Sequence, residues 1–362
     1  MEDSKIRVGI IGLGGWAKYG HIPVLQALDS FEIVAVSSRR LELVQQYAAT
    51  FHIQHAFDDE QALVSHPDVD LVVILAPVPE HARLVKLAIA AGKDVYSEWP
   101  LATNTADSEE LLRLAEAKGV RHIVGLQRRL GPSARYLRDL IKQGYVGKIR
   151  AANMIVSADA FEPNMSERHK WAFPVSSFSH ALSIYGGHFM DMLFQAVGYP
   201  KKLSAVVENH FPYFNIIETG QQVPNATPNE AMIMGTLENG GMFSVQIEGA
   251  QKHRTGLYIE ISGTEGVLRV TNLLAFQNKD DNSILGVNEN GTALTPLPVP
   301  AEYRSLAIPE LDASTQDVSY LYSAYASDKE NGTSQASNFK DAVRQHHLID
   351  QILESSQEFQ SH

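Results

Sequence analysis

The chain has 362 residues, of which 44% are hydrophobic and 20% charged, and this globular composition and length predict two domains. Its 30 Lys and Arg against 42 Asp and Glu give a formal charge of −12, which disfavours nucleic acid as a partner because that binding depends on basic groups. The chain has no Cys, which excludes disulfides, thiolate catalysis and cysteine-ligated metal sites. The sequence shows no signal-peptide pattern and no apolar run that would span a membrane, so we expect a cytoplasmic protein without a membrane partner.

Short β-branched runs alternate with helical segments over the first 125 residues. The expected strands are Ile6–Ile11, Glu32–Val36, Leu71–Leu75, Asp94–Tyr96 and His122–Val124. The expected helices between them include His81–Ala91 and Thr105–Lys118, and Gly119 follows the second as a C-terminal cap. Alternation of this kind predicts a parallel sheet with helices on both faces.

From about residue 150 onward, strand-like runs are joined by turn signals such as Asn239-Gly240-Gly241, with few helices between them. The expected strands are Leu203–Glu208, Ala231–Leu237, Met242–Ile247, Leu257–Ser262 and Val267–Val270. Two further helices are expected at Pro132–Gly144 and about 337–358, whereas residues 271–330 give no clear pattern. We therefore predict an α/β protein, with a nucleotide-binding Rossmann domain over 1–128 and a mainly antiparallel α+β domain over 129–362.

The segment Gly12-Leu13-Gly14-Gly15-Trp16-Ala17 fits the pattern G-x-G-x-x-A. It follows an apolar strand and opens a helical segment, which is the context that a dinucleotide-binding turn requires. Gly12 permits the tight turn, Gly14 lets the backbone approach a pyrophosphate, and Ala17 lets the helix pack closely on the strand. The helix N-terminus supplies N–H groups to the phosphates. The alternative is a tight turn with a purely structural role.

The end of the second strand indicates which nucleotide binds. Enzymes that use NAD(H) usually have an Asp or Glu there, which binds the ribose hydroxyls. This chain has Ser37-Ser38-Arg39-Arg40 instead, and its two hydroxyls and two guanidiniums, with Ser38 and Arg39 as the expected ligands, suit a 2′-phosphate. The segment favours NADP(H) and leaves NAD(H) possible. The alternative is that both arginines belong to a solvated helix start.

Further motifs are spread along nearly the whole chain. They are Ala76-Pro77 with His81, Glu98-Trp99-Pro100, Gly125-Leu126-Gln127-Arg128-Arg129, Gly144–Ile149, Gly187-His188 with Asp191, and Gly263–Gly266. With the glycine-rich turn, they resemble the glucose–fructose oxidoreductase / inositol dehydrogenase (Gfo/Idh/MocA) family. The resemblance implies a Rossmann domain followed by a domain with a large open sheet, through which members form homodimers or homotetramers. It also implies a cofactor-binding role for Ala76, Pro77, His81, Glu98, Trp99 and Gln127.

The family's catalytic groups are a Lys in a Glu-Lys-Pro motif and the Asp and His of a D-x-G-x-H motif. The corresponding residues here are Trp99, Ile184 and His188, so only the His is retained. The resemblance makes His188 the expected acid/base, with Tyr185, His180 or Lys170 as substitutes. The expected substrate-binding residues are Trp99, Arg128, His180 and Asp191. The alternative for each is an ordinary packed or surface residue. We expect no metal site.

Two functions follow from this resemblance. One is an oxidoreductase that moves a hydride between NADP(H) and a small sugar-like substrate, with the Trp99 indole stacked on the nicotinamide or the sugar. The other is a regulator that binds the nucleotide and a protein partner but has lost catalysis. The second is similar to the galactose-regulon repressors of yeasts, family members that hold a transcription activator.

Overall fold

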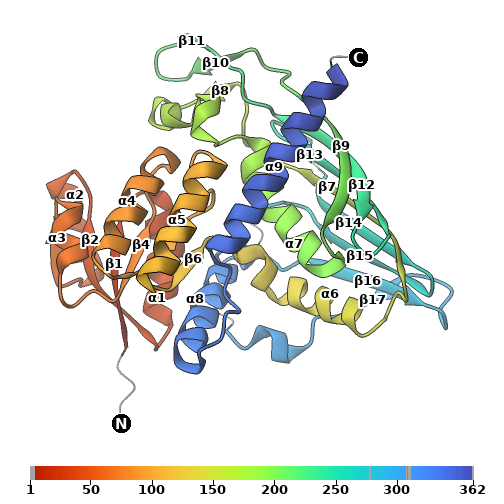
Figure 1. The fold of residues 1–362 in the computed structure, drawn as a ribbon, viewed down its shortest axis with the longest axis horizontal. Helices are drawn as coiled ribbons and strands as arrows, with labels where there is room; N and C mark the ends of the chain where they lie inside the picture. The colour runs from red at the N-terminus through yellow and green to blue at the C-terminus, as the bar shows by residue number, and fades with distance from the viewer. Residues whose placement is uncertain (1–4, 254, 277–278, 307, 309–310, 361–362) are drawn as a thin grey trace. The chain divides into compact units, whose positions relative to one another are not determined.

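The structure is a computed structural model that describes residues 5–253, 255–276, 279–306, 308 and 311–360. The chain forms two compact units, Met1–Gln127 with Thr315–His346, and Arg128–Ser314 with His347–His362 (Figure 1). The expected boundary at residue 128 lies next to this division. The difference is that 315–346 packs with the first unit, because buried residues of that segment, Tyr322 and Tyr325, bond to side chains there.

The first unit contains a six-stranded parallel sheet in the order β3-β2-β1-β4-β5-β6. Its strands are β1 Ile6–Ile11, β2 Phe31–Ser37, β3 His55–Phe57, β4 Leu71–Ile74, β5 Asp94–Ser97 and β6 His122–Val124. The five predicted strands are confirmed, and the short edge strand β3 was not predicted. Continuous apolar runs such as Leu71–Ile74 are buried on both faces, as is usual for parallel strands.

The helices of the first unit follow the strands in alternation. They are η1 Ala17–His21, α1 Ile22–Ala27, α2 Leu41–Phe51, α3 Glu60–Ser65, α4 Val78–Ala90, α5 Thr105–Lys118 and most of α8 Ala313–Asn331. The predicted bounds of α5 are confirmed: the Asn104 side chain accepts a hydrogen bond from the Asp107 N–H, and Gly119 adopts φ +72°. The helix α8 lies in the stretch that the sequence pattern left unassigned; positions 277–278, 307 and 309–310 of that stretch lie outside the described residues.

The second unit contains an eight-stranded sheet in the order β17-β16-β15-β14-β7-β13-β12-β9. Its strands are β7 Ile149–Ser157, β9 Pro200–Glu208, β12 Glu230–Leu237, β13 Met242–Glu248, β14 Gly256–Gly263, β15 Gly266–Asn272, β16 Ser283–Asn288 and β17 Thr295–Pro296. The predicted mainly antiparallel arrangement is confirmed: among the described strands of this sheet, β7 and β13 are the one parallel pair. A small separate sheet consists of β8 Asn164–Met165, β10 Tyr213–Ile216 and β11 Gln222–Pro224.

One face of the large sheet is covered and the other is open. The helical segments of the second unit are α6 Pro132–Lys142, α7 Gly187–Val197, the C-terminal part of α9 Phe339–Gln360, and the short η2 Gln127–Leu130, η3 Glu167–Ala172, η4 Val175–Ser177, η5 Leu182–Gly186 and η6 Ala301–Arg304. The helix α7 packs on β7 and α6 and is buried nearly all round. Along β12, buried Ala231 and Ile233 alternate with the exposed Met232 and Met234, which lie on the open face.

Among the described residues, none of the helices is both long and apolar enough to cross a membrane. The cytoplasmic location expected from the sequence stays a prediction.

Candidate functional site

The predicted glycine-rich turn follows β1 in the first unit. Gly12 adopts φ +99°, and a Cβ there would lie 2.7 Å from the backbone carbon of Leu75, so only glycine fits. At Gly14, by contrast, a Cβ would meet no protein atom within 4 Å. The helical conformation begins at Gly15, and Ala17 is fully buried. The turn therefore has the close backbone and the exposed helix start that a pyrophosphate needs.

The end of β2 lies beside this turn, because the N–H of Gly12 donates to the Ser37 carbonyl at 3.0 Å. The Ser37 hydroxyl is buried and has no hydrogen-bond partner among the described residues. Arg39 and Arg40 are exposed, and within the described chain no carboxylate lies within ion-pair distance of either guanidinium. Ser38, the residue before them, is partly exposed. The end of β2 thus holds a hydroxyl and two guanidinium groups that have no partner among the described residues.

The segment after β4 is fixed by a buried histidine. One ring nitrogen of His81 lies 2.8 Å from the Ala76 carbonyl and the other 2.7 Å from the Pro100 carbonyl. Burial lowers the pKa of His81, which favours the neutral ring. Both ring nitrogens therefore face backbone, and His81 positions the Ala76-Pro77 segment against Pro100.

A hydrogen-bond chain holds Glu98, the first residue of the Glu98-Trp99-Pro100 motif. Its Oε1 accepts from the Tyr96 hydroxyl at 2.8 Å and lies 2.8 Å from His21 Nε2. His21 Nδ1 lies 2.6 Å from the hydroxyl of Tyr322. Burial raises the pKa of Tyr96 and of Tyr322, which keeps both phenols protonated. Sequence reasoning missed His21 and Tyr322, since they belong to no motif and stand 301 positions apart.

The residue at the family's lysine position is buried. Trp99 is 4% exposed, and its ring centroid lies 4.9 Å from that of His346 in α9. Gln127, also predicted to bind the cofactor, has a buried side-chain oxygen without a hydrogen-bond partner in the described part of the chain. An orphaned buried acceptor is costly unless a ligand or water satisfies it, so Gln127 fits a binding role.

In the second unit, the predicted acid/base lies in an aromatic cluster. Phe276 is at its centre, with ring centroids 5.4 Å from His188, 5.1 Å from Tyr185 and 5.2 Å from Phe189. The Arg128 guanidinium lies 4.7 Å from the Phe276 ring centroid and donates to the Ala275 carbonyl and the Ser314 hydroxyl. Sequence reasoning missed Phe276, because the stretch 271–330 carried no pattern.

The other predicted residues of this unit lie in different surroundings. Asp191 is 2% exposed and pairs with Arg129, its carboxylate 3.1 Å from the guanidinium Nε. Lys170, in η3, is exposed and lies 4.0 Å from the Glu167 carboxylate. The structure thus brings His188, Tyr185 and Arg128 together around Phe276, while Asp191 is held in a buried ion pair.

His180 is fully buried, and we therefore expect the free energy of unfolding to depend on pH. Burial lowers its pKa to about 4, whereas the unfolded chain has the ordinary value of about 6.5. As pH falls below about 6.5, the unfolded state takes up the proton first, so stability present at pH 7 is lost toward pH 4, by up to about 3 kcal/mol. Urea unfolding at the two pH values should show this loss, and His180→Asn, which does not titrate, should show less of it. An equal loss in both proteins would contradict the prediction.

Each of the two units matches a known protein-family model. Residues 6–126 match the family model described as "Oxidoreductase family, NAD-binding Rossmann fold", and residues 132–272 match the model "Gal80p, C-terminal domain". Dehydrogenase aclE of Aspergillus oryzae is 33% identical over 220 residues, which are 58% of this chain and 60% of that protein. The galactose/lactose metabolism regulatory protein GAL80 of Saccharomyces cerevisiae is 27% identical over 290 residues, 74% of this chain and 67% of that protein.

Solved structures share the fold along the whole chain. A super-repressor mutant of Gal80p from Saccharomyces cerevisiae matches with a TM-score of 0.86 at 23% identity, covering 98% of this chain and 96% of that one. Levoglucosan dehydrogenase in complex with NADH and levoglucosan matches with a TM-score of 0.85 at 22% identity, covering 98% of each chain. Oxidoreductases and regulators thus share this architecture. Residues 6–126 are thus an NAD-binding Rossmann domain of the Gfo/Idh/MocA oxidoreductase family, and residues 132–272 are a domain of the Gal80p C-terminal type.

Proposed function

We propose that this chain is an oxidoreductase that transfers a hydride between a nicotinamide cofactor and a carbinol of the sugar or polyol class. The observation that carries the proposal is His188, the one family catalytic group retained, which lies with Tyr185 around Phe276. Oxidation of a carbinol needs a group that takes up the hydroxyl proton, and an imidazole does this near neutral pH. Turnover of NADP⁺ with a panel of sugars and polyols, in the unmodified chain and in His188→Asn, tests it.

The residues of the first unit fit a dinucleotide. Gly12 and Gly14 form the turn that takes the pyrophosphate, and Gln127 offers a buried oxygen without a partner among the described residues. When bound, the nicotinamide supplies or accepts the hydride. In the second unit, His188 holds or releases the substrate proton at a ring nitrogen. Arg128 positions Phe276 through its stacking and its hydrogen bond to the Ala275 carbonyl.

We further propose that NADP(H) is preferred over NAD(H), which remains a weaker ligand. The support is the end of β2, where Arg39 and Arg40 are exposed and unpaired among the described residues and no carboxylate stands in Ser37–Arg40. A carboxylate there would repel a 2′-phosphate, whereas guanidinium groups bind one with charge-assisted hydrogen bonds.

Cofactor binding should change the tryptophan fluorescence. Trp16 lies in the glycine-rich turn and Trp99 in the motif after β5, so a dihydronicotinamide bound to this unit is close enough to accept their excitation energy. We expect NADPH to quench the emission strongly and saturably. Trp171→Phe, which removes an exposed indole of the second unit, should leave most of the quenching intact. Saturable NADPH binding with unchanged emission would place the cofactor elsewhere.

The open face of the large sheet supports a homodimer or homotetramer. Met232, Met234 and Met242 are each more than half exposed there, and a groove of about 440 Å³ crosses the neighbouring strands β7, β13, β12 and β9. Exposed apolar patches of this kind mark interfaces. Met232→Glu with Met234→Glu should therefore shift the protein to monomer in light scattering. Ile217→Glu, an equally exposed position outside this sheet, should not. A monomeric unmodified chain would contradict the proposal.

A second candidate function is a nucleotide-binding regulator that works through a protein partner. The observation that favours it is Trp99, because an indole buried at the family's lysine position takes up no proton. Ile184, one helical turn before His188, likewise replaces the family's Asp with an apolar group. The likeness to GAL80, named as a regulatory protein, points the same way. Absence of hydride transfer with every sugar, together with tight nucleotide binding, would favour this function.

A further inference from the structure

A group of two histidines and an aspartate lies in the first unit, away from the nucleotide-binding turn. His55 begins β3, His66 follows the end of α3, and Asp68 lies in the loop that leads into β4. This loop enters the amino end of β4, whereas Gly12 and Ala76 follow the carboxyl ends of their strands. The group is therefore separate from the dinucleotide site in the topology of the sheet.

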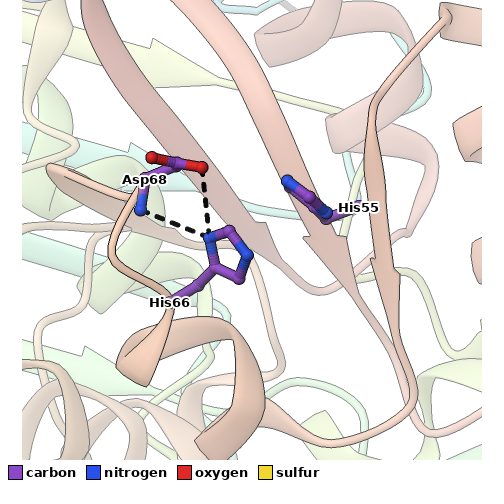
Figure 2. A group of neighbouring side chains, drawn as sticks. All are labelled: His55, His66 and Asp68. Carbon is purple, nitrogen blue, oxygen red and sulfur yellow. Dashed lines mark hydrogen bonds and ion pairs between the residues drawn. The ribbon is translucent and has the colours of Figure 1, made fainter.

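The three side chains are close enough to share one ion. Each offers a ligand atom, and these atoms all lie within 4.8 Å of one another (Figure 2). The Nδ1 of His66 is 4.0 Å from the Asp68 Oδ2, and the ring centroids of the two histidines are 4.2 Å apart. Tetrahedral zinc with bonds of about 2.1 Å places its ligand atoms roughly 3.4 Å apart. Rotations that bring the ligand atoms together by up to about 1.4 Å reach that geometry.

The loop that carries His66 and Asp68 is already held in place. The Arg7 guanidinium binds Asp68 Oδ1 at 2.7 Å and Asp70 Oδ1 at 2.9 Å. Lys93 Nζ donates to the His66 and Val69 carbonyls at 3.0 and 2.7 Å. Because Arg7 takes Oδ1, the other carboxylate oxygen of Asp68 is the one that faces His66. Metal-coordinating side chains on a loop that is already fixed lose little conformational entropy when they bind an ion.

His55 supplies an observation that points independently to a ligand. Its Nε2 is buried and has no hydrogen-bond partner among the described residues. His66 Nδ1 accepts a long hydrogen bond of 3.3 Å from the Asp68 N–H, which a metal ion would replace. Two imidazoles and one carboxylate form the mixed N and O donor set that zinc takes.

We propose that His55, His66 and Asp68 bind one divalent transition-metal ion, with Zn²⁺ as the fitting case and water completing the coordination. The ion would join the three-residue edge strand β3 to the loop before β4. The other end of β3 receives the Ser38 N–H at the Phe57 carbonyl, so the strand also supports the segment proposed to read the nucleotide. The site is therefore structural and separate from the reaction.

The test is calorimetric titration of Zn²⁺ into the full chain, freed of any affinity tag and stripped with a chelator. We expect one ion per chain with micromolar affinity, weakened at least about tenfold by His55→Gln and by His66→Asn. The second variant keeps an oxygen that accepts from the Asp68 N–H. His52→Asn is the matched control, because His52 is exposed and adopts a left-handed φ of 56° that Asn tolerates.

Thermal unfolding gives a second measurement on the same proteins. Zn²⁺ should raise the unfolding temperature of the unmodified chain and of His52→Asn, and should raise that of His66→Asn much less. If His55→Gln does not fold, His66→Asn and Asp68→Asn decide the outcome. The absence of stoichiometric Zn²⁺ binding would overturn the proposal. Equal Zn²⁺ binding in all the variants would also overturn it, because other residues, such as another of the chain's 14 histidines, would then hold the ion.

Discussion

Replacement of His188 by Asn is expected to lower kcat by about 10²–10⁴-fold, the usual contribution of a general acid–base group. The affinity for the cofactor should be nearly unchanged, because His188 lies in α7 of the second unit and the dinucleotide turn lies in the first. Asn keeps a polar side chain beside Phe276 but exchanges no proton near neutral pH. Steady-state kinetics together with calorimetric titration of NADPH separate the two effects.

The matched control is His347→Asn, which removes an exposed imidazole from α9. It should leave both turnover and cofactor affinity as they are. Turnover that survives His188→Asn would move the acid/base role to Tyr185, which shares the Phe276 contact. His180 and Lys170 are weaker alternatives, since the first is buried with its pKa lowered to about 4 and the second is exposed beside Glu167.

Substitution at Trp99 distinguishes the enzyme from the regulator. In an enzyme that relies on His188, Trp99→Lys should reduce turnover, because it places an ammonium where a buried indole contacts His346. A regulator that has lost catalysis should show no hydride transfer at all. Trp99→Lys with Ile184→Asp should then restore a trace of transfer, since the pair returns the family's two missing groups.

The preference between the two nucleotides should invert in Ser38→Asp with Arg39→Ala. The change removes a guanidinium that suits the 2′-phosphate and adds a carboxylate that accepts from the ribose hydroxyls. Loss of one charge-assisted contact costs about 1.5–3 kcal/mol, or roughly ten- to a hundredfold in NADP affinity. Calorimetric dissociation constants for NADP and NAD, each with the unmodified and the changed chain, measure the inversion.

Arg168→Ala serves as the control for net charge, because it removes an exposed guanidinium from the second unit. It should change neither dissociation constant appreciably. If the unmodified chain binds NAD more tightly than NADP, Arg39 and Arg40 are solvated residues at the start of α2 and the preference proposed here is wrong.

The elements that the sequence predicted share strong local signals. The strand β1 is a continuous apolar run before a glycine-rich turn, and α5 carries its own cap at Asn104 and Gly119. Such signals do not depend on distant parts of the chain, so they can be recognised in one sequence. The hairpin β14–β15 is similar, since Gly263 and Gly266 mark its turn.

The elements that were missed depend on tertiary packing. The helix α7 is buried nearly all round and has no polar face to reveal its period, and α8 is polar enough to resemble a loop. The central strand β7 mixes Arg, Asn and Ala with its apolar residues, although it pairs with both β13 and β14. Stability of these segments comes from neighbours distant in sequence, which propensity does not report.

In the candidate site too, local motifs could be predicted from the sequence, whereas contacts between distant residues could not. The glycine turn and His188 were identified by motif, because phosphate binding and proton transfer restrict the residue types. The surroundings of these groups were not, since Phe276 reaches His188 from position 276 and Tyr322 reaches His21 across 301 positions. A single sequence carries no signal for such contacts when neither partner belongs to a motif.

The most direct measurement is the rate of NADP⁺ reduction by the unmodified chain with a panel of sugars and polyols, followed by the nicotinamide absorbance. We expect reduction with at least one of these carbinols, at a rate that His188→Asn lowers by at least about a hundredfold. No reduction with any of them, by a chain that still binds NADP tightly, would contradict the proposed oxidoreductase function and favour the regulator.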